Sequence, residues 1–450
     1  MTENCPFAPI VVANLPPAVA PGGGAQYALH NNLLSDVTLP SDRSVSDMFI
    51  FSKRVKPRGK VTNQRSSGRC WLFAALNMLR IATIRDKKLA NDFEFSQSYL
   101  FFWDKLERVN YVLQAFEAAS TPASGGAAEP LEGRMLQFLL QDPLGDGGQW
   151  QMFTNLVDKH GLVPQSAYPE TKHSGNSRGL NMVLTRKVRE WCRDIRANPA
   201  AFDRQAALAE THRLLVRFLG APPREFTWQY YEKDETHRRL EHLTPQTFYR
   251  DHVGVNLSEY VSLINDPRNA YGTTFGVDKL GNVAGGTAVK YLNMPMDRLV
   301  ALTKQAIDAN ESVWFGSDVS QSLRSQSCVM DAQLFDIEGF LGVNFGLSKR
   351  ERIEYGESQM THAMCITGYN EDAYGHADRW EVENSWGSRG PAAGYYAMTT
   401  PWFRDNVFQI VVRRAHLTEA ERAQWEQPIA RRFPPWDPMG ALAGARADTA

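Results

Sequence analysis

The sequence predicts an α+β protein in which a helical part precedes a strand-rich part. The first observation is apolar residues at helical spacing, such as Leu72, Leu76 and Leu79. The second is a change near residue 286, after which short runs of aromatic and β-branched residues are separated by polar turns. Helical regions followed by strands, without strict alternation of the two, favour α+β over a parallel α/β sheet.

Three helices are expected in the first part of the chain. The first contains the three leucines, and the second covers residues 96–120, with Ser96 or Ser98 as its N-cap. The third begins near Trp150, after the glycine turn in "DGGQW", and ends at Gly161.

Changes in composition divide the chain into five segments. A stretch rich in Arg, Glu, Ala and His predicts a helical insertion, and five runs after it predict strands. The segments are an N-terminal extension (1–62), a helical region (63–174), the helical insertion (175–285), a strand-rich region (286–415) and a C-terminal arm (416–450). The strand-like runs are residues 312–320, 360–369, 378–387, 394–400 and 407–415.

Charge and cysteine content limit the class of protein. Lys plus Arg total 49 and Asp plus Glu total 50, a net charge of -1, which gives no support for nucleic-acid binding. No apolar run approaches the roughly 20 residues of a membrane span, and the first residues lack a signal-peptide pattern. Five cysteines without C-x-x-C spacing indicate neither a disulfide framework nor a metal site. We therefore expect a reduced, cytoplasmic protein with no metal and no cofactor.

One cysteine, Cys70, lies between a polar run and a helix in "NQRSSGRCWLFAALN". Unpaired N–H groups and the helix dipole favour a thiolate at a helix N-terminus, and the thiolate is the nucleophile in acyl transfer. A lone helical cysteine is more often a small buried apolar residue, which is our interpretation of Cys192, Cys328 and Cys365.

A cysteine nucleophile needs a base, and the base needs a group that orients it. "THAMCITGY" supplies His362 on an expected strand, and "WEVENSWG" supplies Asn384 on the next. The Asn384 carbonyl can accept the imidazole N–H and fix the tautomer, while Trp386 keeps water from that bond. Each residue alone is equally consistent with a structural role, and the combination with Cys70 favours catalysis.

These residues resemble the ordered signature of papain-like cysteine peptidases: Gln64, then Cys70 six residues later, then a strand histidine, then Asn-Ser-Trp-Gly. Ser67 stands where secreted members have a disulfide cysteine, which suits a reducing compartment. His362 follows Cys70 by 292 residues, against roughly 130–150 in papain-like enzymes. The resemblance therefore requires a large insertion, and residues 175–285 are the candidate.

Longer strings resemble the bleomycin hydrolase and bacterial aminopeptidase C branch, from about residue 30 to 443. They include "SSGRCW", "DGGQW", "NDPR", "MTHAM" and "WDPMGALA". The resemblance implies a papain-like two-lobed fold, with a helical lobe, a strand-rich barrel lobe, a large helical insertion and a C-terminal arm. It also implies a homohexameric cysteine aminopeptidase that acts on peptides with a free N-terminus through an acyl-enzyme.

The resemblance assigns a role to each site residue. Cys70 is the nucleophile, His362 the general base and acid, and Asn384 the residue that orients the imidazole. Gln64 and the Cys70 backbone N–H form the oxyanion hole, and the resting pair is a thiolate and an imidazolium. The substrate-binding residues are Gly147 and Gly148, whose backbone pairs with an extended peptide, and Trp386, which covers the His–Asn bond.

The C-terminal tail departs from the resembling family. There the chain ends at or just after "MGALA" inside its own cleft, and its carboxylate meets the substrate's amino group. Here seven residues, "GARADTA", follow Ala443. Self-trimming near Ala443 or Gly444, threading past the cleft with altered specificity, and a tail-blocked latent enzyme are three outcomes. We favour trimming, because Ala-Gly-Ala near a cysteine nucleophile is an easy substrate.

Two alternatives come from other classes. One is a non-catalytic or nucleic-acid-associated cage, against which the balanced charge and the intact Cys/His/Asn/Gln set argue. The other is a transglutaminase-like acyltransferase, which also uses Cys and His but usually has Asp as the third member.

Overall fold

The computed structural model describes residues 24–40, 46–121 and 128–444 of the 450-residue chain. These residues form two compact units. The smaller unit combines the described residues of Met1–Arg43 with Gln333–Gly346. It contains three helices and a backbone hydrogen bond of 2.8 Å from Asp336 N to the Thr38 carbonyl. The helices are α1 (Gly24–Asn31), α2 (Leu34–Val37) and α11 (Ile337–Leu341).

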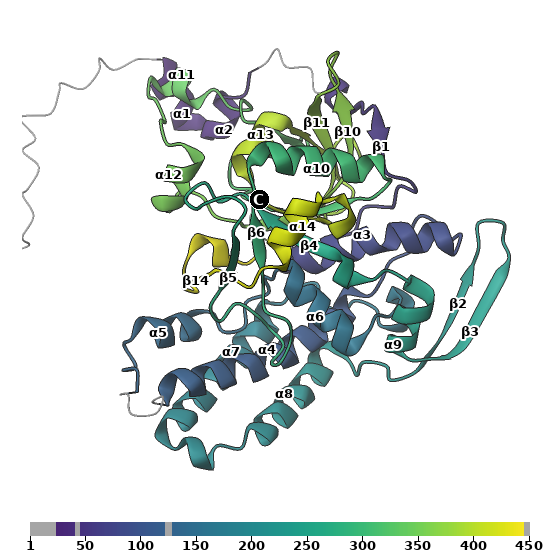
Figure 1. The fold of residues 1–450 in the computed structure, drawn as a ribbon, viewed down its shortest axis with the longest axis vertical. Helices are drawn as coiled ribbons and strands as arrows, with labels where there is room; N and C mark the ends of the chain where they lie inside the picture. Colours follow the sequence, from purple (N-terminus) through teal and green to yellow (C-terminus); the bar gives the residue numbers. More distant parts are fainter. Residues whose placement is uncertain (1–23, 41–45, 122–127, 445–450) are drawn as a thin grey trace, which may run out of the picture. The chain divides into compact units, whose positions relative to one another are not determined.

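The larger unit, Ser44–Ala332 with Leu347–Ala450, contains every site residue discussed below. Its described part has a sheet in the order β14-β5-β6-β4-β13-β7-β10-β11-β12-β9-β8, with β1 paired to β10 (Figure 1). The strands are β1 (Lys53–Arg54), β4 (Tyr260–Ile264), β5 (Thr274–Val277), β6 (Tyr291–Asn293), β7 (Val313–Ser317), β8 (Leu323–Arg324), β9 (Val329–Met330), β10 (His362–Glu371), β11 (Ala377–Glu383), β12 (Tyr395–Thr399), β13 (Val407–Arg413) and β14 (Arg431–Phe433).

The predicted strands of the second half are confirmed as β7, β10, β11, β12 and β13. β10 lies between β7 and β11, with His362 opposite Ser317 and Cys365 opposite Glu383. Its first eight residues are buried because helices cover both faces, α3 on one and α10 on the other. Met364 accordingly belongs to one apolar cluster and Ala363 to the other.

The three helices expected in the first part are also confirmed. α3 (Cys70–Asp86) is buried along most of its length, and the Ser96 hydroxyl caps α4 (Gln97–Ser120) by accepting Tyr99 N–H at 3.0 Å. α6 (Trp150–His160) ends at Gly161, whose φ of 71° suits glycine. The other helices of this unit are α5 (Arg134–Gln141), α7 (Arg178–Ala197), α8 (Arg204–Leu219), α9 (Pro245–Phe248), α10 (Met296–Asp308), α12 (Lys349–Glu354), α13 (Thr400–Asn406) and α14 (Glu419–Glu426).

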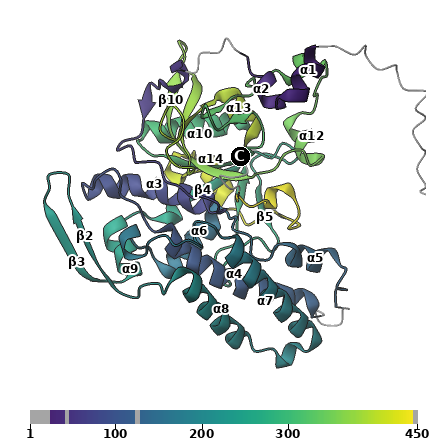
Figure 2. The same ribbon diagram turned by 180° about the vertical axis from the view of Figure 1, so that it is seen from behind.

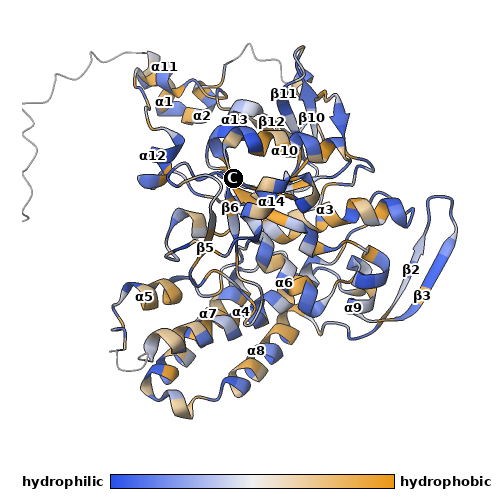
Figure 3. Ribbon diagram, viewed as in Figure 1, coloured by the Kyte–Doolittle hydropathy of each residue, from blue (hydrophilic) through white to orange (hydrophobic). Residues whose placement is uncertain are grey.

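The helical expectation for residues 175–285 is correct for α7, α8 and the short α9, and wrong for the strands β2 (Phe226–Tyr231), β3 (His237–Leu243), β4 and β5. β2 and β3 form an antiparallel hairpin that extends past α9 in both views (Figures 1 and 2). The physical reason is the aromatic, β-forming run in β2, where Trp228 is buried with its ring 5.1 Å from that of Phe248. β3 is largely hydrophilic (Figure 3).

No helix in the described ranges has both the length and the apolar character needed to cross a membrane. The C-terminal segment contains α14 and then β14, which pairs in parallel with β5. A short 3₁₀ turn, η8 (Pro438–Gly440), follows, and Ala443 then pairs with Gly148. This return path brings the end of the described chain to the first turn of α6.

Candidate active site

Cys70 is the first residue of α3 and is fully buried. The loop before it is fixed through Gln64, whose Nε2 donates to the Ser67 carbonyl at 2.7 Å. The Gln64 side-chain oxygen accepts the Ser385 hydroxyl at 2.6 Å. These bonds connect the segment that precedes the cysteine with the residue that follows Asn384.

His362 is the first residue of β10, and Asn384 follows the last residue of the neighbouring strand β11. His362 Nε2 is 2.9 Å from Asn384 Oδ1, and the Trp386 ring lies 4.8 Å from the imidazole at 33° to it. The other ring nitrogen, Nδ1, has no hydrogen-bond partner among the described groups. Because Asn384 Oδ1 accepts, the neutral imidazole carries its proton on Nε2, and Nδ1 remains for the thiol.

The Cys70 thiol contacts the backbone amide of Ala363, the residue after His362. Burial raises the pKa of the Cys70 thiol to about 12, and the backbone amides at Ala363 and Trp71 offset only part of this effect. Burial also lowers the pKa of His362 to about 4. Both shifts favour the neutral thiol and the neutral imidazole in this buried arrangement, and the thiolate–imidazolium pair stays a prediction.

The chain's own C-terminal segment lies beside these two residues. Ala443 pairs with Gly148 in an antiparallel bridge, with N–O distances of 3.0 and 3.2 Å. Gly444 N donates to the carbonyl of Thr361, immediately before His362, at 2.9 Å. The Gly444 carbonyl oxygen lies 2.6 Å from where a Cβ on Gly68 would stand. The tail thus runs in an extended conformation between the glycine pair, Gly147 and Gly148, and the backbone of Gly68 and Thr361.

The glycine pair has no room for side chains. A Cβ on Gly147 would lie 2.8 Å from the Leu442 Cβ, and a Cβ on Gly148 would overlap the Trp71 ring. Absence of a side chain is therefore what lets an extended segment approach this backbone.

A family model, the peptidase C1-like family, matches residues 23–440. The chain belongs to this family. It is 40% identical over 427 residues to aminopeptidase C of Streptococcus thermophilus, covering 92% of this chain and 93% of that protein. It is 39% identical over 440 residues to human bleomycin hydrolase, covering 93% and 95%. These relatives confirm the branch that the sequence motifs indicated.

A solved structure supports the same relationship. The crystal structure of PepW from Lactobacillus rhamnosis HN001 is similar to this fold, with a TM-score of 0.88 and 38% identity. The match covers 93% of this chain and 94% of the PepW chain. The mixed helix and strand content is therefore that of a papain-like family member.

Asp146, just before the glycine pair, is a site residue that the sequence reasoning did not identify. Its buried carboxylate accepts Gly68 N–H at 2.9 Å and pairs with Lys105 Nζ at 2.8 Å. Asn181 and Ser177 on the insertion side also donate to it. Lys105, Ser177 and Asn181 hold the pKa of this carboxyl far below its usual range despite burial. The Asp in "DGGQW" was visible in the sequence, but its partners were not.

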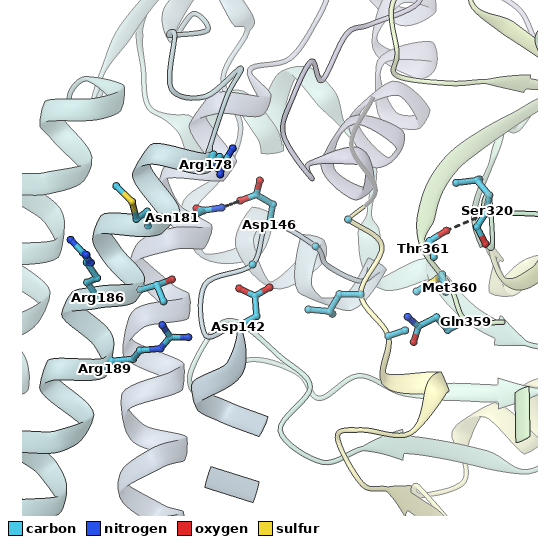
Figure 4. A pocket seen from close by; sticks show the side chains of 18 residues that line it. Asp142, Asp146, Arg178, Asn181, Arg186, Arg189, Ser320, Gln359, Met360 and Thr361 are labelled. Carbon is cyan, nitrogen blue, oxygen red and sulfur yellow. Dashed lines mark hydrogen bonds between the residues drawn. The ribbon is translucent and has the colours of Figure 1, made fainter. Parts of the chain in front are cut away.

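Beside the tail is an open cleft of about 840 Å³. Figure 4 shows Arg178, Asn181 and Arg189 of α7 along one side, and Gln359 and Thr361 along the other. The described residues include no cluster of three or more His, Cys, Asp or Glu that could hold a metal ion. The reactive groups of this site are a thiol, an imidazole and a side-chain amide.

Proposed function

We propose that this protein is a cysteine aminopeptidase of the bleomycin hydrolase type, acting on peptides with a free N-terminus. The observation that carries the proposal is the His362–Asn384 pair beside a helix-terminal Cys70, with an extended segment seated on Gly148. This combination supplies a nucleophile, an oriented base and a track for a peptide backbone.

The reaction has two steps. Cys70 loses its proton to His362, and its sulfur bonds to the carbonyl carbon of the substrate's first residue. His362 gives the proton to the leaving amine as the peptide C–N bond breaks, which leaves an aminoacyl thioester. Water, deprotonated by His362, then releases the free amino acid. The Gln64 amide and the Cys70 backbone N–H stabilise the oxyanion in both steps.

The tail restricts the enzyme to removing residues from the N-terminus of a peptide. Because it occupies the backbone track at Gly147 and Gly148, a substrate cannot extend in that direction beyond its first residue. A carboxylate at the tail end would attract the substrate's ammonium in a water-poor cleft. Ala443 is buried against this glycine backbone, so it lies where a longer substrate would have to bind.

The same register favours self-trimming after Gly444. Its amide donates to the carbonyl of Thr361, the residue before His362, and its carbonyl lies against Gly68, two residues before Cys70; these contacts support the bond after Gly444 as the proposed cleavage site. Attack would form a Gly444 thioester and release the residues from Ala445 onward; hydrolysis would leave a Gly444 carboxylate. The new terminal residue, held by one backbone hydrogen bond, would swing aside for a substrate. We expect intact mass to end at Gly444 in active protein and to include the following residues in Cys70→Ala; equal masses would rule trimming out.

Several finer features belong to the same proposal. They are a two-lobed papain-like arrangement, an insertion at 175–285, a hexameric assembly and a cytoplasmic location. The unpaired buried cysteines at 70, 192, 328 and 365 suit a reducing compartment.

A pair of aminoacyl amides with a fluorogenic leaving group tests the function. We expect release from the free amine, none from its N-acetyl form, and none by Cys70→Ala. A variant ending at Gly440 should gain activity on N-acetylated peptides, because the track is empty. Release that is unchanged in Cys70→Ala would overturn the proposal.

A further inference from the structure

The hydrogen bonds that hold the tail inside the cleft go to its backbone, while the buried Ala443 and the close approach of Gly444 to Gly147 favour small residues. Gln149 Nε2 donates to the Ala441 carbonyl at 2.7 Å, and Ala443 and Gly444 are held through their backbones. Side chains of an extended chain repeat every two residues, and alanine stands at 441, 443, 445 and 447. A slip by two residues would restore the backbone hydrogen bonds and keep alanine at the buried position, and only the close approach at Gly444 would oppose it. The hydrogen bonds inside the cleft therefore do not select one register by themselves.

A specific contact lies at Asp437, just before η8. Arg268 Nη2 donates to Asp437 Oδ1 at 2.8 Å, and Arg268 Nη1 to Oδ2 at 3.3 Å. The Arg268 and Asp437 side chains are only 14% and 15% exposed. Asp437 Oδ1 also accepts Met439 N–H at 2.9 Å, which starts the turn leading to the tail.

Arg268 is itself fixed on the body of the protein. Asp266, whose side chain is fully buried, receives Arg268 Nε at 2.9 Å and Nη2 at 3.0 Å. Asp266 also receives the Asn269 side-chain amide at 2.9 Å. The guanidinium thus bridges an immobile carboxylate to one on the tail segment, in the planar geometry to which arginine is suited.

The segment after the anchor has little freedom to absorb a slip. A Cβ on Gly440 would lie 2.9 Å from the Pro435 carbonyl oxygen and 3.0 Å from Val277 Cγ1. The Trp436 ring lies 4.1 Å from the Arg134 guanidinium. A slip of two residues moves the chain by about 6.6 Å, which would break both the Gly440 and the Trp436 contacts.

We infer that the Arg268–Asp437 ion pair sets the register of the tail, and with it the peptide bond that lies beside Cys70. Arg268 is a positioning residue in this role. The pair links "NDPR" and "WDPMGALA", two motifs for which the catalytic chemistry alone gives no reason. The consequence for cleavage rests on the proposed function, whereas the register itself does not.

The register is tested without peptidase activity, in the Cys70→Ala protein treated with a carboxypeptidase and measured by intact mass. The parent should stop at one end near Gly444. Asp437→Asn keeps the cap at Met439 and leaves Arg268 paired with Asp266, so the body stays folded. In this variant we expect several ends spaced two residues apart, or digestion past Ala441. Arg268→Gln should behave in the same way.

Glu421→Gln is the matched control. Glu421 also lies upstream of the tail and also receives an arginine in two bonds, from Arg298 at 2.6 and 2.9 Å. It should leave the end unchanged. Identical ends in Asp437→Asn and the parent, with equal thermal midpoints, would overturn the inference.

The kinetics of the active enzyme test the register of the tail a second time. Asp437→Asn should raise kcat/KM on N-acetylated relative to free substrate by about tenfold, as expected if about 1.4 kcal/mol of discrimination is lost. Glu421→Gln should not change this ratio. If neither parent nor variant hydrolyses any substrate, the proposed function fails while the carboxypeptidase result still decides the register.

Discussion

At Cys70, the helix N-terminus lowers the pKa of the thiol, and burial raises it. A helix N-terminus stabilises a nearby charge by about 0.3–1 kcal/mol, less than the 1.36 kcal/mol that corresponds to one pH unit. Burial therefore prevails, and the pKa of the thiol is raised to about 12 while that of His362 is lowered to about 4. The tail lies beside this pair, at Gly68, Gly148 and Thr361, and we predict that it contributes to the burial and so favours the neutral forms.

Alkylation by iodoacetamide reads this charge state directly. With the tail present, the rate at Cys70 should rise about tenfold per pH unit from pH 6 to 9, because the thiolate is the reacting form and the pKa lies above this range. In a variant ending at Gly440, the rate should be higher and nearly flat over pH 6–8. Peptide mass identifies the modified cysteine. Superimposable profiles would contradict the role given to the tail.

Gln64 provides a second prediction at this scale. Gln64→Ala should lower kcat by about 10²–10³, the usual loss for one oxyanion donor, with a much smaller change in KM. Cys70→Ala should remove turnover entirely. Gln165→Ala, a glutamine bonded to Glu94 instead, serves as control. An effect on KM alone would assign Gln64 to substrate binding.

At the scale of elements, one buried ion pair ties the glycine turn to its surroundings. Asp146 connects the loop before α3, helix α4 through Lys105, and helix α7 through Asn181. Its backbone carbonyl also accepts the Trp71 indole at 2.7 Å. The turn that carries Gly147 and Gly148 is thereby held in place relative to Cys70.

Asp146→Asn should leave the Lys105 ammonium buried without its counter-charge. We expect a loss of about 3–5 kcal/mol in the free energy of unfolding, measured by urea titration, together with lower kcat. Asp142→Asn changes an exposed carboxyl in the same cleft and should alter stability by no more than about 0.5 kcal/mol. Similar losses of stability for the two variants would refute the stabilising role given to the Asp146–Lys105 ion pair.

Elements with a local signal could be predicted, and those defined by distant partners could not. Ser96 and Gly161 marked helix ends because cap geometry is local. The strands β1, β8 and β9 are two residues long and exist only through their neighbours. Asp146 shows the same limit, because Lys105 and Asn181 are far from it in the sequence.

For the whole molecule, the fold joins residues that are far apart in sequence. Cys70 and His362 meet because α3 packs on β10, and residue 443 returns to Gly148 through β14 and η8. The order of Gln, Cys, His and Asn in the sequence was enough to predict residues that the fold brings near one another, while their roles in catalysis stay a prediction. The tail's register was not predictable, because alternating alanines leave it open and the Arg268–Asp437 contact depends on the fold.

The most direct measurement is acid-quenched mass spectrometry during turnover of an aminoacyl ester, followed by peptic digestion at low pH. The account predicts an aminoacyl adduct on the peptide containing Cys70, longer-lived when His362 is replaced by Ala and absent in Cys70→Ala. Turnover with no adduct, or with the adduct on another residue, would contradict it.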